Sequence, residues 1–396
     1  MAVIKERARA AFCAAVLTGA IVYDRIPAAA LDRFVSTAGH DPSNTCLSPT
    51  DPCLTLAHAA DQAASGDVIK VTGGKYRDHV TVGPGHCCSP PSLVGVTFSG
   101  GWSSDFSTRD PHSHVTEVQG RGSDGRRNAA FQIETQLDQV VDLTIDGLTL
   151  RHGSGGLAAA TSGTSSLVVT ILDSRIVENK RGEFGSGIHA AAAGKSSISL
   201  SLRDTTIAFN STTGPSGNAG GGIQTFAGNS ATISLSLQNC VVARNVAPAN
   251  PIAARPAEGG GIDLDTDPFA STQLSLQSCT IVKNTAVPRP LPRVAAHGGG
   301  VFVGGRGATK VVLTDTILWG NTANLGKDLY VSQEGTVSVD ADHSDIGERL
   351  VPGAGFNDLG GNTSVDPALT PSLHLKSTSP MIDVGTCVAA PVADFE

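Results

Sequence analysis

The sequence predicts an all-β chain that folds as a single-stranded right-handed parallel β-helix with an N-terminal helical cap. First, the middle of the chain repeats, alternating Gly-Gly-Gly-Ile marks with Ile-x-x-Asn marks. Second, Ile198, Leu200 and Leu202 alternate with polar residues, as in a strand with one buried face. Third, no segment between the units is long enough and helix-patterned enough to be a crossover helix. Parallel strands must then stack as coils that rise about 4.8 Å each, with the right-handed connection usual for such strands.

The composition agrees with this class and excludes others. The 396 residues include 46 glycines and 21 prolines, and 16% are charged, against about 25% in an average protein. Helical bundles and coiled coils are richer in charged residues, and a chain that is 40% apolar with a net charge of -8 is not disordered. The acidic balance, with no basic block longer than Arg126-Arg127, argues against a nucleic-acid partner.

The first thirty residues have the pattern of an export signal. Three basic residues precede an apolar run from Ala10 to Val22, and Ala28-Ala29-Ala30 offers a small-residue cleavage site. The run is too short to span a bilayer, which needs about 20 residues. We therefore expect a secreted or cell-surface protein without a transmembrane span. Its expected parts are a signal peptide (1–30), an N-terminal cap with the first coils (31–139), regular β-helix repeats (140–345) and a C-terminal coil (346–396).

The cysteines indicate disulfides rather than a metal. No Cys-x-x-Cys pair exists, and no His lies at zinc-ligand spacing from a cysteine. In an exported chain, disulfides are the default. Cys46 and Cys53 flank a Ser-Pro-Thr-Asp-Pro turn, so we expect a local bridge between them. Cys240 and Cys279 are expected to be vertical neighbours, and their parallel side chains favour stacked thiols over a bond.

Each repeat has a constant part and a variable part. The distance from the apolar end of a glycine mark to the next Asn is 22 residues in four units and 20 in the fifth. The distance from the Asn, or from His152 in the first unit, to the apolar end of the next glycine mark varies from 5 to 17 residues. Stacked coils must keep register but loops need not, so segments 211–220, 246–258 and 285–297 should leave one edge of the stack as loops. The glycine marks end at Leu157, Ile188, Ile223, Ile262 and Val301, and the other marks end at Asn179, Asn210, Asn245, Asn284 and Asn321, with His152 at the equivalent place one unit earlier.

Two polar columns are expected at the corners of the coils. Asn tolerates the left-handed conformation of a tight corner, and stacked Asn amides can hydrogen-bond along their column. The second column consists of short polar residues that cap turns, with a calcium ladder as the alternative. Its members are Asp146, Asp173, Asp204, Asn239, Ser278 and Asp315. The small residues that follow them, such as Ser174 and Thr205, are expected to face the core.

The N-terminal cap is predicted from helical spacing. Leu54, Leu56, Ala57, Ala60 and Ala64 recur at that spacing, and Ser65-Gly66 ends the pattern. A short amphipathic helix there would cover the open apolar end of the stack, because terminal repeats need caps.

The repeat marks resemble those of bacterial right-handed β-helix proteins, including chlamydial polymorphic outer-membrane proteins, which have Phe at the position of Ile, Val or Leu in this sequence. The segment from Val35 to Ile69 is similar to the opening coil of the same exported class, and the segment from His374 to Thr386 resembles the choice-of-anchor Q domain. The resemblance implies a pectate-lyase-like solenoid. It implies no single activity, because the class includes adhesins, passenger-like surface proteins and polysaccharide lyases.

The C-terminal coil is expected to be incomplete or loosely held. Domains like the one it resembles usually run on to a further strand. Leu373–Leu375 and Met381–Val384 have strand-like patterns, but the residues after Cys387 lack alternation. An uncovered end of a β-helix exposes unpaired backbone groups, which such proteins normally protect.

Candidate site residues follow the glycine marks. If the last residue of each mark points inward, the next one points outward. His189, Gln224, Asp263 and Phe302 are therefore expected to form one exposed column. Phe226 belongs to the column beside it, two residues further along its strand.

Carboxylates on this face indicate a cation site. Asp263, Asp265 and Asp267 alternate along one strand, so they share a face at intervals of about 6.5–7 Å. Carboxylates are ligands that Ca²⁺ prefers, so these residues are candidate calcium ligands, although the pattern requires no cofactor. The neighbouring loops add further polar residues, namely Arg255, Glu258, Arg289, Arg293 and His297.

Two functions fit this face. The leading hypothesis is a monomeric surface or secreted protein that binds a polysaccharide, a cell-surface glycan or a protein. Its binding residues would be Gln224, Phe226, Phe302, Arg255, Arg289 and His297. The alternative is a polysaccharide lyase or glycoside hydrolase that acts on an acidic polysaccharide at the same face, with Asp263, Asp265, His189 and Arg293 as catalytic residues. Common catalytic motifs, such as His-Glu-x-x-His and Gly-x-Ser-x-Gly, are absent.

Overall fold

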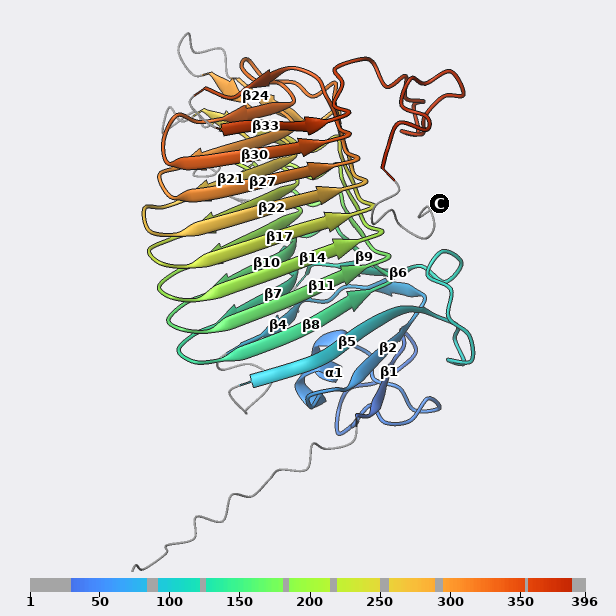
Figure 1. The fold of residues 1–396 in the computed structure, drawn as a ribbon. Helices are drawn as coiled ribbons and strands as arrows, with labels where there is room; N and C mark the ends of the chain where they lie inside the picture. Colours follow the sequence, from blue (N-terminus) through green and yellow to red (C-terminus); the bar gives the residue numbers. More distant parts are fainter. Residues whose placement is uncertain are drawn as a thin grey trace, which may run out of the picture.

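The computed structural model describes residues 30–83, 92–121, 126–180, 185–213, 219–249, 256–288, 295–352 and 355–386. They form a parallel β-helix, which confirms the predicted fold class (Figure 1). The strands at the front of Figure 1 run from left to right, and the chain returns behind them and rises by one coil, so the helix is right-handed. None of the helices in the described residues is long and apolar enough to cross a membrane.

Three parallel sheets form the walls of the β-helix. The long sheet contains, in spatial order, β1 (Asp32–Val35), β2 (Val68–Thr72), β5 (Ser92–Trp102), β8 (Val140–Asp146), β11 (Ser166–Leu172), β14 (Ser197–Arg203), β17 (Thr232–Gln238), β22 (Ser271–Gln277), β27 (Ala308–Thr314), β30 (Thr336–Asp342) and β33 (Gly355–Gly360). The short-strand sheet contains β3 (Gly74–Tyr76), β6 (Thr116–Gln119), β9 (Leu148–Arg151), β12 (Arg175–Val177), β15 (Thr206–Ala208), β18 (Val241–Ala243), β23 (Thr280–Val282), β28 (Ile317–Trp319) and β31 (Asp345–Ile346). The loop-flanked sheet contains β4 (Val80–Val82), β7 (Ala129–Thr135), β10 (Gly155–Thr161), β13 (Ile188–Ala192), β16 (Ile223–Ala227), β21 (Ile262–Thr266), β26 (Val301–Gly305), β29 (Leu329–Val331) and β32 (Arg349–Leu350).

The register of the sheets follows the repeat marks. Leu157, Ile188, Ile223, Ile262 and Val301 pair in succession across the loop-flanked sheet, and all five are buried. The alternating residues of the long sheet also face inward, as the period of two predicts. One continuous core therefore runs through the stack.

The Asn marks form the predicted ladder. The Asn245 side-chain oxygen accepts hydrogen bonds from the backbone N–H and the side-chain amide of Asn210, each at 3.0 Å. The same pair of bonds joins every neighbouring pair from Asn179 to Asn321. Asp328 ends the ladder by accepting both bonds from Asn321.

Two details of this corner differ from the sequence-based expectation. The left-handed conformation falls on the residue before each Asn, for example Phe209 (φ 58°) and Arg244 (φ 57°), while the Asn itself places its backbone N–H and side chain in the ladder. His152 is not equivalent to the Asn residues. Arg151 pairs with Val177, so His152 lies beside Glu178, and Gly153 takes the place next to Asn179.

The second polar column forms the other corner of the short-strand sheet. Asp173, Asp204, Asn239, Ser278 and Asp315 all adopt left-handed backbone conformations. Asp146 does not belong to this column. It pairs with Leu172 inside a strand, and Gly147 takes the corner position in that coil. The small residues after the corner, from Ser174 to Thr316, are buried as predicted.

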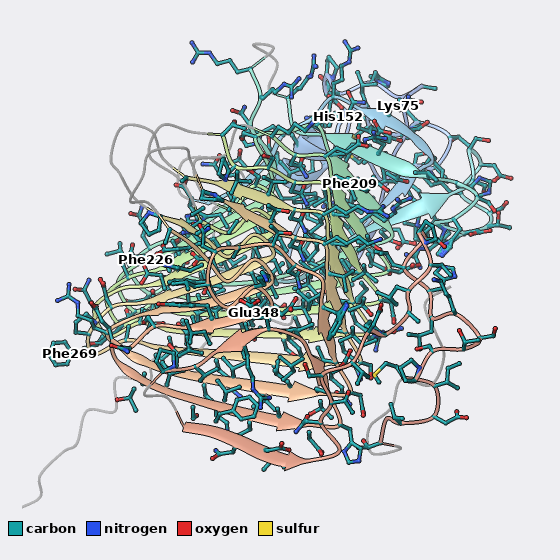
Figure 2. All side chains as sticks on the ribbon, turned by 90° about the horizontal axis from the view of Figure 1, so that it is seen from above. Lys75, His152, Phe209, Phe226, Phe269 and Glu348 are labelled. Carbon is teal, nitrogen blue, oxygen red and sulfur yellow. A yellow bond between two sulfur atoms is a disulfide. The ribbon has the colours of Figure 1, made fainter. Side chains whose placement is uncertain are left out.

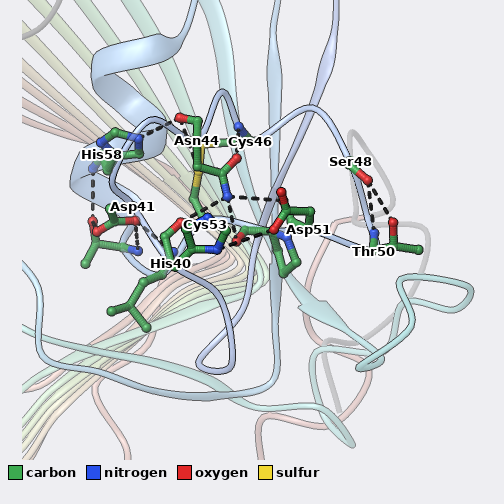
Figure 3. Close-up of polar contacts among 12 residues, drawn as sticks. His40, Asp41, Asn44, Cys46, Ser48, Thr50, Asp51, Cys53 and His58 are labelled. Atoms are coloured by element: carbon green, nitrogen blue, oxygen red, sulfur yellow. Dashed lines mark hydrogen bonds and ion pairs between the residues drawn. A yellow bond between two sulfur atoms is a disulfide. The ribbon is translucent and has the colours of Figure 1, made fainter.

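The N-terminal region holds the expected bridge and a helix. Cys46 and Cys53 form a disulfide with Cα atoms 5.1 Å apart, as an oxidising compartment permits. The side chain of Asn44 bonds to the loop that the bridge closes (Figure 3). Helix α1 (Leu56–Gln62) starts at Thr55, whose side chain accepts from the backbone N–H of His58, and it packs against β1, β2 and β4. Its role as a cap stays a prediction, and residues 1–29 of the expected signal lie outside the described chain.

The described parts of the variable loops leave the same edge of the stack, as predicted. β19 (Val246–Pro248) pairs with β24 (Thr285–Val287), and β20 (Ala257–Glu258) pairs with β25 (Ala296–His297). Ala219 joins this edge through a bridge to Glu258. Between these short strands lies a small separate core, whose members among the described residues are all alanines.

The C-terminal segment contradicts one expectation. After β33 it turns back along the stack, where the backbone N–H of Thr386 donates to Asp315 and Arg244 donates to the Pro371 carbonyl, each at 2.6 Å. Neither segment with a strand-like pattern forms a strand: Leu375 makes only an isolated antiparallel bridge to Leu369, and residues 381–383 form a turn. Leu373 (φ 77°) and Asp383 (φ 59°) are left-handed and interrupt any extended run. Residues 387–396, on which the expectation of a loose end rests, lie outside the described chain.

Cys240 and Cys279 are buried free thiols in neighbouring coils, as expected. Burial, and then the neighbouring Cys279, raise the pKa of the Cys240 thiol well above its ordinary value. We expect iodoacetamide at pH 8 to leave both cysteines unmodified in the native protein and to modify both in denaturant, because the thiolate is the reactive form. Peptide mass spectrometry after alkylation checks this. Labelling of Cys240 in the native protein would contradict the stacked, closed core.

Candidate functional site

The column expected to be exposed is covered. His189, Gln224, Asp263 and Phe302 do pair in succession on the outer side of the loop-flanked sheet. However, Asp263 is 1% exposed, Gln224 and Phe302 are each 6% exposed, and His189 is half-buried. The expectation of exposure is wrong for Gln224, Asp263 and Phe302, because the chain just before β16, β21 and β26 folds back against them at Gly220, Gly259 and Gly298. Strands β20 and β25 lie there.

Asp263 is the most unusual side chain of this column. Its Oδ1 is buried and has no hydrogen-bond partner in the structure. Burial, followed by the negative charges of Glu258 and Asp265, raises the pKa of Asp263 well above its ordinary value, and a hydrogen bond with Gln224 opposes the shift. The protonated form of Asp263 therefore persists to a higher pH than that of an ordinary aspartate.

His189 reaches Asp263 only through Gln224. The Nδ1–H of His189 donates to the Gln224 side-chain oxygen at 3.0 Å, which leaves the Gln224 amide group to face Asp263. Burial lowers the pKa of His189, so the ring is neutral at pH 7. His189 and Asp263 are two strands apart, about 10 Å between backbones. They do not converge directly on one reacting atom.

Three parallel rings lie beside the carboxyl groups. The Phe302 and Tyr330 rings are 5.5 Å apart and 5° from parallel, and His297 stacks on Tyr330 at 4.6 Å and 10°. Phe302 comes directly after Asp263 in the column. A Cβ on Gly304 would collide with the Phe302 ring, so glycine at that position lets the ring lie against the sheet. Tyr330 was missed by the sequence reasoning, because the unit that carries it lacks the triple-glycine mark.

The three Asp residues proposed for calcium follow one another along the chain at β21 but do not gather. Asp263 is buried, Asp265 is half-buried and Asp267 is exposed beyond the end of β21. Among the described residues, the one group of three or more side chains whose ligand atoms approach within 4.8 Å of one another is Cys46, Cys53 and His58. Its two sulfurs form the disulfide, and the His58 ring contacts the Asn44 carbonyl. Calcium at the Asp residues stays a prediction.

The remaining predicted site residues divide into two groups. Phe226 and His297 are half-buried and lie on the same side of the loop-flanked sheet as Asp265. Arg255, Arg289 and Arg293 lie outside the described residues.

A second depression was not foreseen from the sequence. A pocket of about 360 Å³ at the Asn corner is lined by Arg127, His152, Glu178, Lys180 and Phe209. The His152 Nε2 lies 3.0 Å from the Glu178 carboxylate, and Arg151 also pairs with Glu178. Figure 2 labels His152 and Phe209 near each other, away from Phe226. The residue before each Asn mark was the signal available, since the left-handed corner turns its side chain outward.

Comparisons with known proteins add only a general likeness. No protein-family model matches the chain, so the resemblance to polymorphic outer-membrane-protein repeats and to the choice-of-anchor Q domain gains no support there. No curated protein matches it either. Among solved structures, the chain is similar to a pectate lyase, Pel9A, at 13% identity over 90% of this chain and 91% of that one, with a TM-score of 0.43. It is also similar to a rhamnogalacturonan lyase at 12% identity over 79% of this chain and 73% of that one, with a TM-score of 0.33. With so few shared residues, neither structure transfers a residue role to this chain.

Proposed function

We propose that the protein is exported and binds a glycan chain on the loop-flanked sheet, over the stretch from Phe226 to Tyr330. The observation that carries the proposal is the set of parallel rings of His297, Phe302 and Tyr330 beside the carboxyl groups of Asp263 and Asp265. A calcium ion at this face and a monomeric state belong to the same proposal.

The rings suit the faces of sugars. A pyranose presents C–H groups on its faces, and half-buried Tyr330 and His297 offer flat apolar surface with polar groups at the edge. Because Tyr330 stacks on both neighbours, its ring is held in place before a ligand arrives. Such preorganisation reduces the entropy cost of binding.

The carboxyl groups suit the hydroxyl groups at the edges of sugar rings. Half-buried Asp265 and Glu258 can accept hydrogen bonds from hydroxyl groups. Half-buried Tyr330 adds a hydroxyl group that can donate one, whereas Asp263 is covered. A site with both donors and acceptors is better suited to a polyhydroxylated ligand than to a uniformly charged partner.

The proposal is tested on an array of neutral and acidic oligosaccharides, with and without EDTA. We expect the wild type to bind a subset of chains, and Tyr330→Ala to bind them about 5- to 10-fold more weakly, since an aromatic contact contributes about 0.5–1.5 kcal/mol. His297→Ala serves as a second variant at the loop edge, and thermal unfolding verifies that both variants are folded.

Phe209→Ala is the matched control, because Phe209 is an exposed ring in the corner pocket. We expect this variant to bind like the wild type. If Phe209→Ala weakened binding and Tyr330→Ala did not, the glycan site would be the corner pocket. A wild type that binds no oligosaccharide would end the proposal. A loss of binding in EDTA would support a calcium ion at the binding site.

A second candidate is cleavage of the bound polysaccharide, and the raised pKa of Asp263 favours it. A carboxyl with a raised pKa keeps its proton to a higher pH than usual and could protonate the leaving oxygen of a glycosidic bond that reached it, while a second carboxylate, here Asp265 or Glu258, assists water. This favours a hydrolase over a lyase. A lyase needs a base, and His189, whose Nδ1–H donates to Gln224, could supply one only through Nε2, two strands away from Asp263.

Release of reducing ends from the bound polysaccharide distinguishes binding from cleavage. If the protein is a hydrolase, Asp263→Asn should lower turnover at least about 100-fold, because the proton donor is lost. Asp61→Asn, which changes an exposed carboxyl on helix α1 outside the proposed face, should leave turnover unchanged. If the protein binds a polysaccharide but releases no reducing ends from it, the protein is a binding protein and not a hydrolase.

A further inference from the structure

Phe269 occupies a backbone position that disfavours a bulky side chain. Residues 267–270 form a tight turn in which the backbone N–H of Ala270 donates to the Asp267 carbonyl at 3.1 Å. Pro268 takes the second position of the turn, and Phe269 takes the third with φ 71°. A turn with Pro second and a left-handed residue third strongly prefers Gly or Asn there. At this position a bulky ring strains the backbone.

The ring of Phe269 gains nothing from the fold in return. It is 92% exposed, more than any other large apolar side chain in the described residues. In Figure 2 it projects from the edge of the stack, on the side where Phe226 lies. The turns at the same place in three earlier coils have Gly163, Gly194 or Asn229 as their left-handed residue, one position earlier in the turn. Phe269 therefore costs stability through its strained backbone and through its solvent-exposed ring. A residue kept at such a cost is a candidate for function.

The surroundings of Phe269 continue the proposed glycan face. Asp267 precedes it by two residues, and Asp265 precedes it by four. A Cβ on Gly228 would lie 3.2 Å from the Phe226 ring and 3.6 Å from Asp267 Oδ2, so that ring and that carboxylate are close neighbours. Carboxylates and rings therefore alternate from Asp263 outward to Phe269. The row ends about one strand length from Asp263.

The small area of the Phe269 side chain indicates the kind of partner that it can bind. One aromatic side chain buries at most about 250 Å², far below the roughly 1,200 Å² of a stable protein interface. A sugar ring is of the right size. Its C–H face can stack on Phe269 while its hydroxyl groups reach Asp267, which is exposed.

We propose that Phe269 is an outer binding platform for a pyranose ring, at the far end of a chain whose inner units lie over Asp263 and Tyr330. The inference rests on the proposed glycan-binding function and adds one contact to it. Its specific consequence is that only chains long enough to span from the inner residues to Phe269 use the platform.

Phe269→Asn tests the platform, because Asn accepts the left-handed turn and removes the ring. We expect it to raise the midpoint of thermal unfolding by about 1–3 °C, since strain is relieved. On the array it should bind hexasaccharides about 3- to 10-fold more weakly and disaccharides as the wild type does. Phe269→Trp, which keeps a ring, should bind hexasaccharides as tightly as the wild type.

Leu137→Asn is the matched control. Leu137 is also bulky, 73% exposed and left-handed (φ 63°), in the turn after β7 four coils away. It should gain the same thermal stability and change no binding. Equal hexasaccharide binding by Phe269→Asn and the wild type would overturn the platform and leave the proposed function standing. A wild type that binds no oligosaccharide would overturn both.

Discussion

Asn245→Ala is expected to lower the free energy of unfolding by about 3–5 kcal/mol. The Asn245 side chain makes four hydrogen bonds, two accepted from Asn210 and two donated to the Ile207 carbonyl and to Asn284. Asn245 is fully buried, so water cannot replace these bonds. Alanine leaves the Asn210 backbone N–H without its acceptor, and each buried group left unpaired costs about 1–3 kcal/mol. Urea unfolding measures the loss.

Asn357→Ala is the matched control for the ladder. Asn357 is exposed on β33 and donates one hydrogen bond to Asp340, so its loss should change stability by less than about 0.5 kcal/mol. Native-state hydrogen exchange should show increased opening of β15, β18 and β23 in Asn245→Ala, since coils of a solenoid depend on their neighbours. If Asn245→Ala lost less than about 1 kcal/mol, the ladder would be a consequence of the fold rather than a support for it.

Asp263→Asn is expected to stabilise the protein at neutral pH by about 1–3 kcal/mol, through removal of a buried ionisable group with an unpaired oxygen. The effect must depend on pH. Unfolded Asp263 releases its proton near pH 4, whereas folded Asp263 keeps it to a higher pH. In that window the folded state binds more protons, so linkage makes wild-type stability fall as pH rises. Asn carries no such proton, so the advantage of the variant grows across the window.

The measurement compares urea unfolding of the two proteins from about pH 3 to pH 8. The difference should be smallest at the acid end, where Asp263 is protonated in both states. Asp267→Asn is the control, because its exposed carboxyl should change stability by less than about 0.5 kcal/mol throughout. A difference independent of pH would show that Asp263 does not titrate differently in the folded protein. A stabilised variant that no longer binds glycan would identify Asp263 as a functional group that the fold tolerates at a cost.

The fold was predictable because its main determinants are local and repeated. Ile198, Leu200 and Leu202 alternate with polar residues, and a period of two leaves little choice but a strand with one face inward. The constant spacing from Ile188 to Asn210 then forces equal coils into register. Even the disulfide between Cys46 and Cys53 depends on a turn within one short segment.

The candidate site was predictable in its residues but not in its environment. The glycine marks place Gln224, Asp263 and Phe302 in one column, and the register confirms it. Their burial depends on loops whose length varies from coil to coil, so no repeated pattern reports it. Tyr330 joins them from a unit without the triple-glycine mark, and its stacking on His297 is a contact between β29 and strand β25 of the loop edge.

By itself the sequence determined which side chains point inward, which residues stack on which, and the edge from which the loops leave. These follow from the period of a strand and from a constant repeat length, both of which are read along the chain. Only the tertiary structure decided that the loop edge covers Asp263, that the left-handed corner falls on Phe209 rather than Asn210, and that Phe269 stands free in solvent. Burial and corner geometry depend on segments that pack together from different coils, and a pattern along the chain does not contain that information.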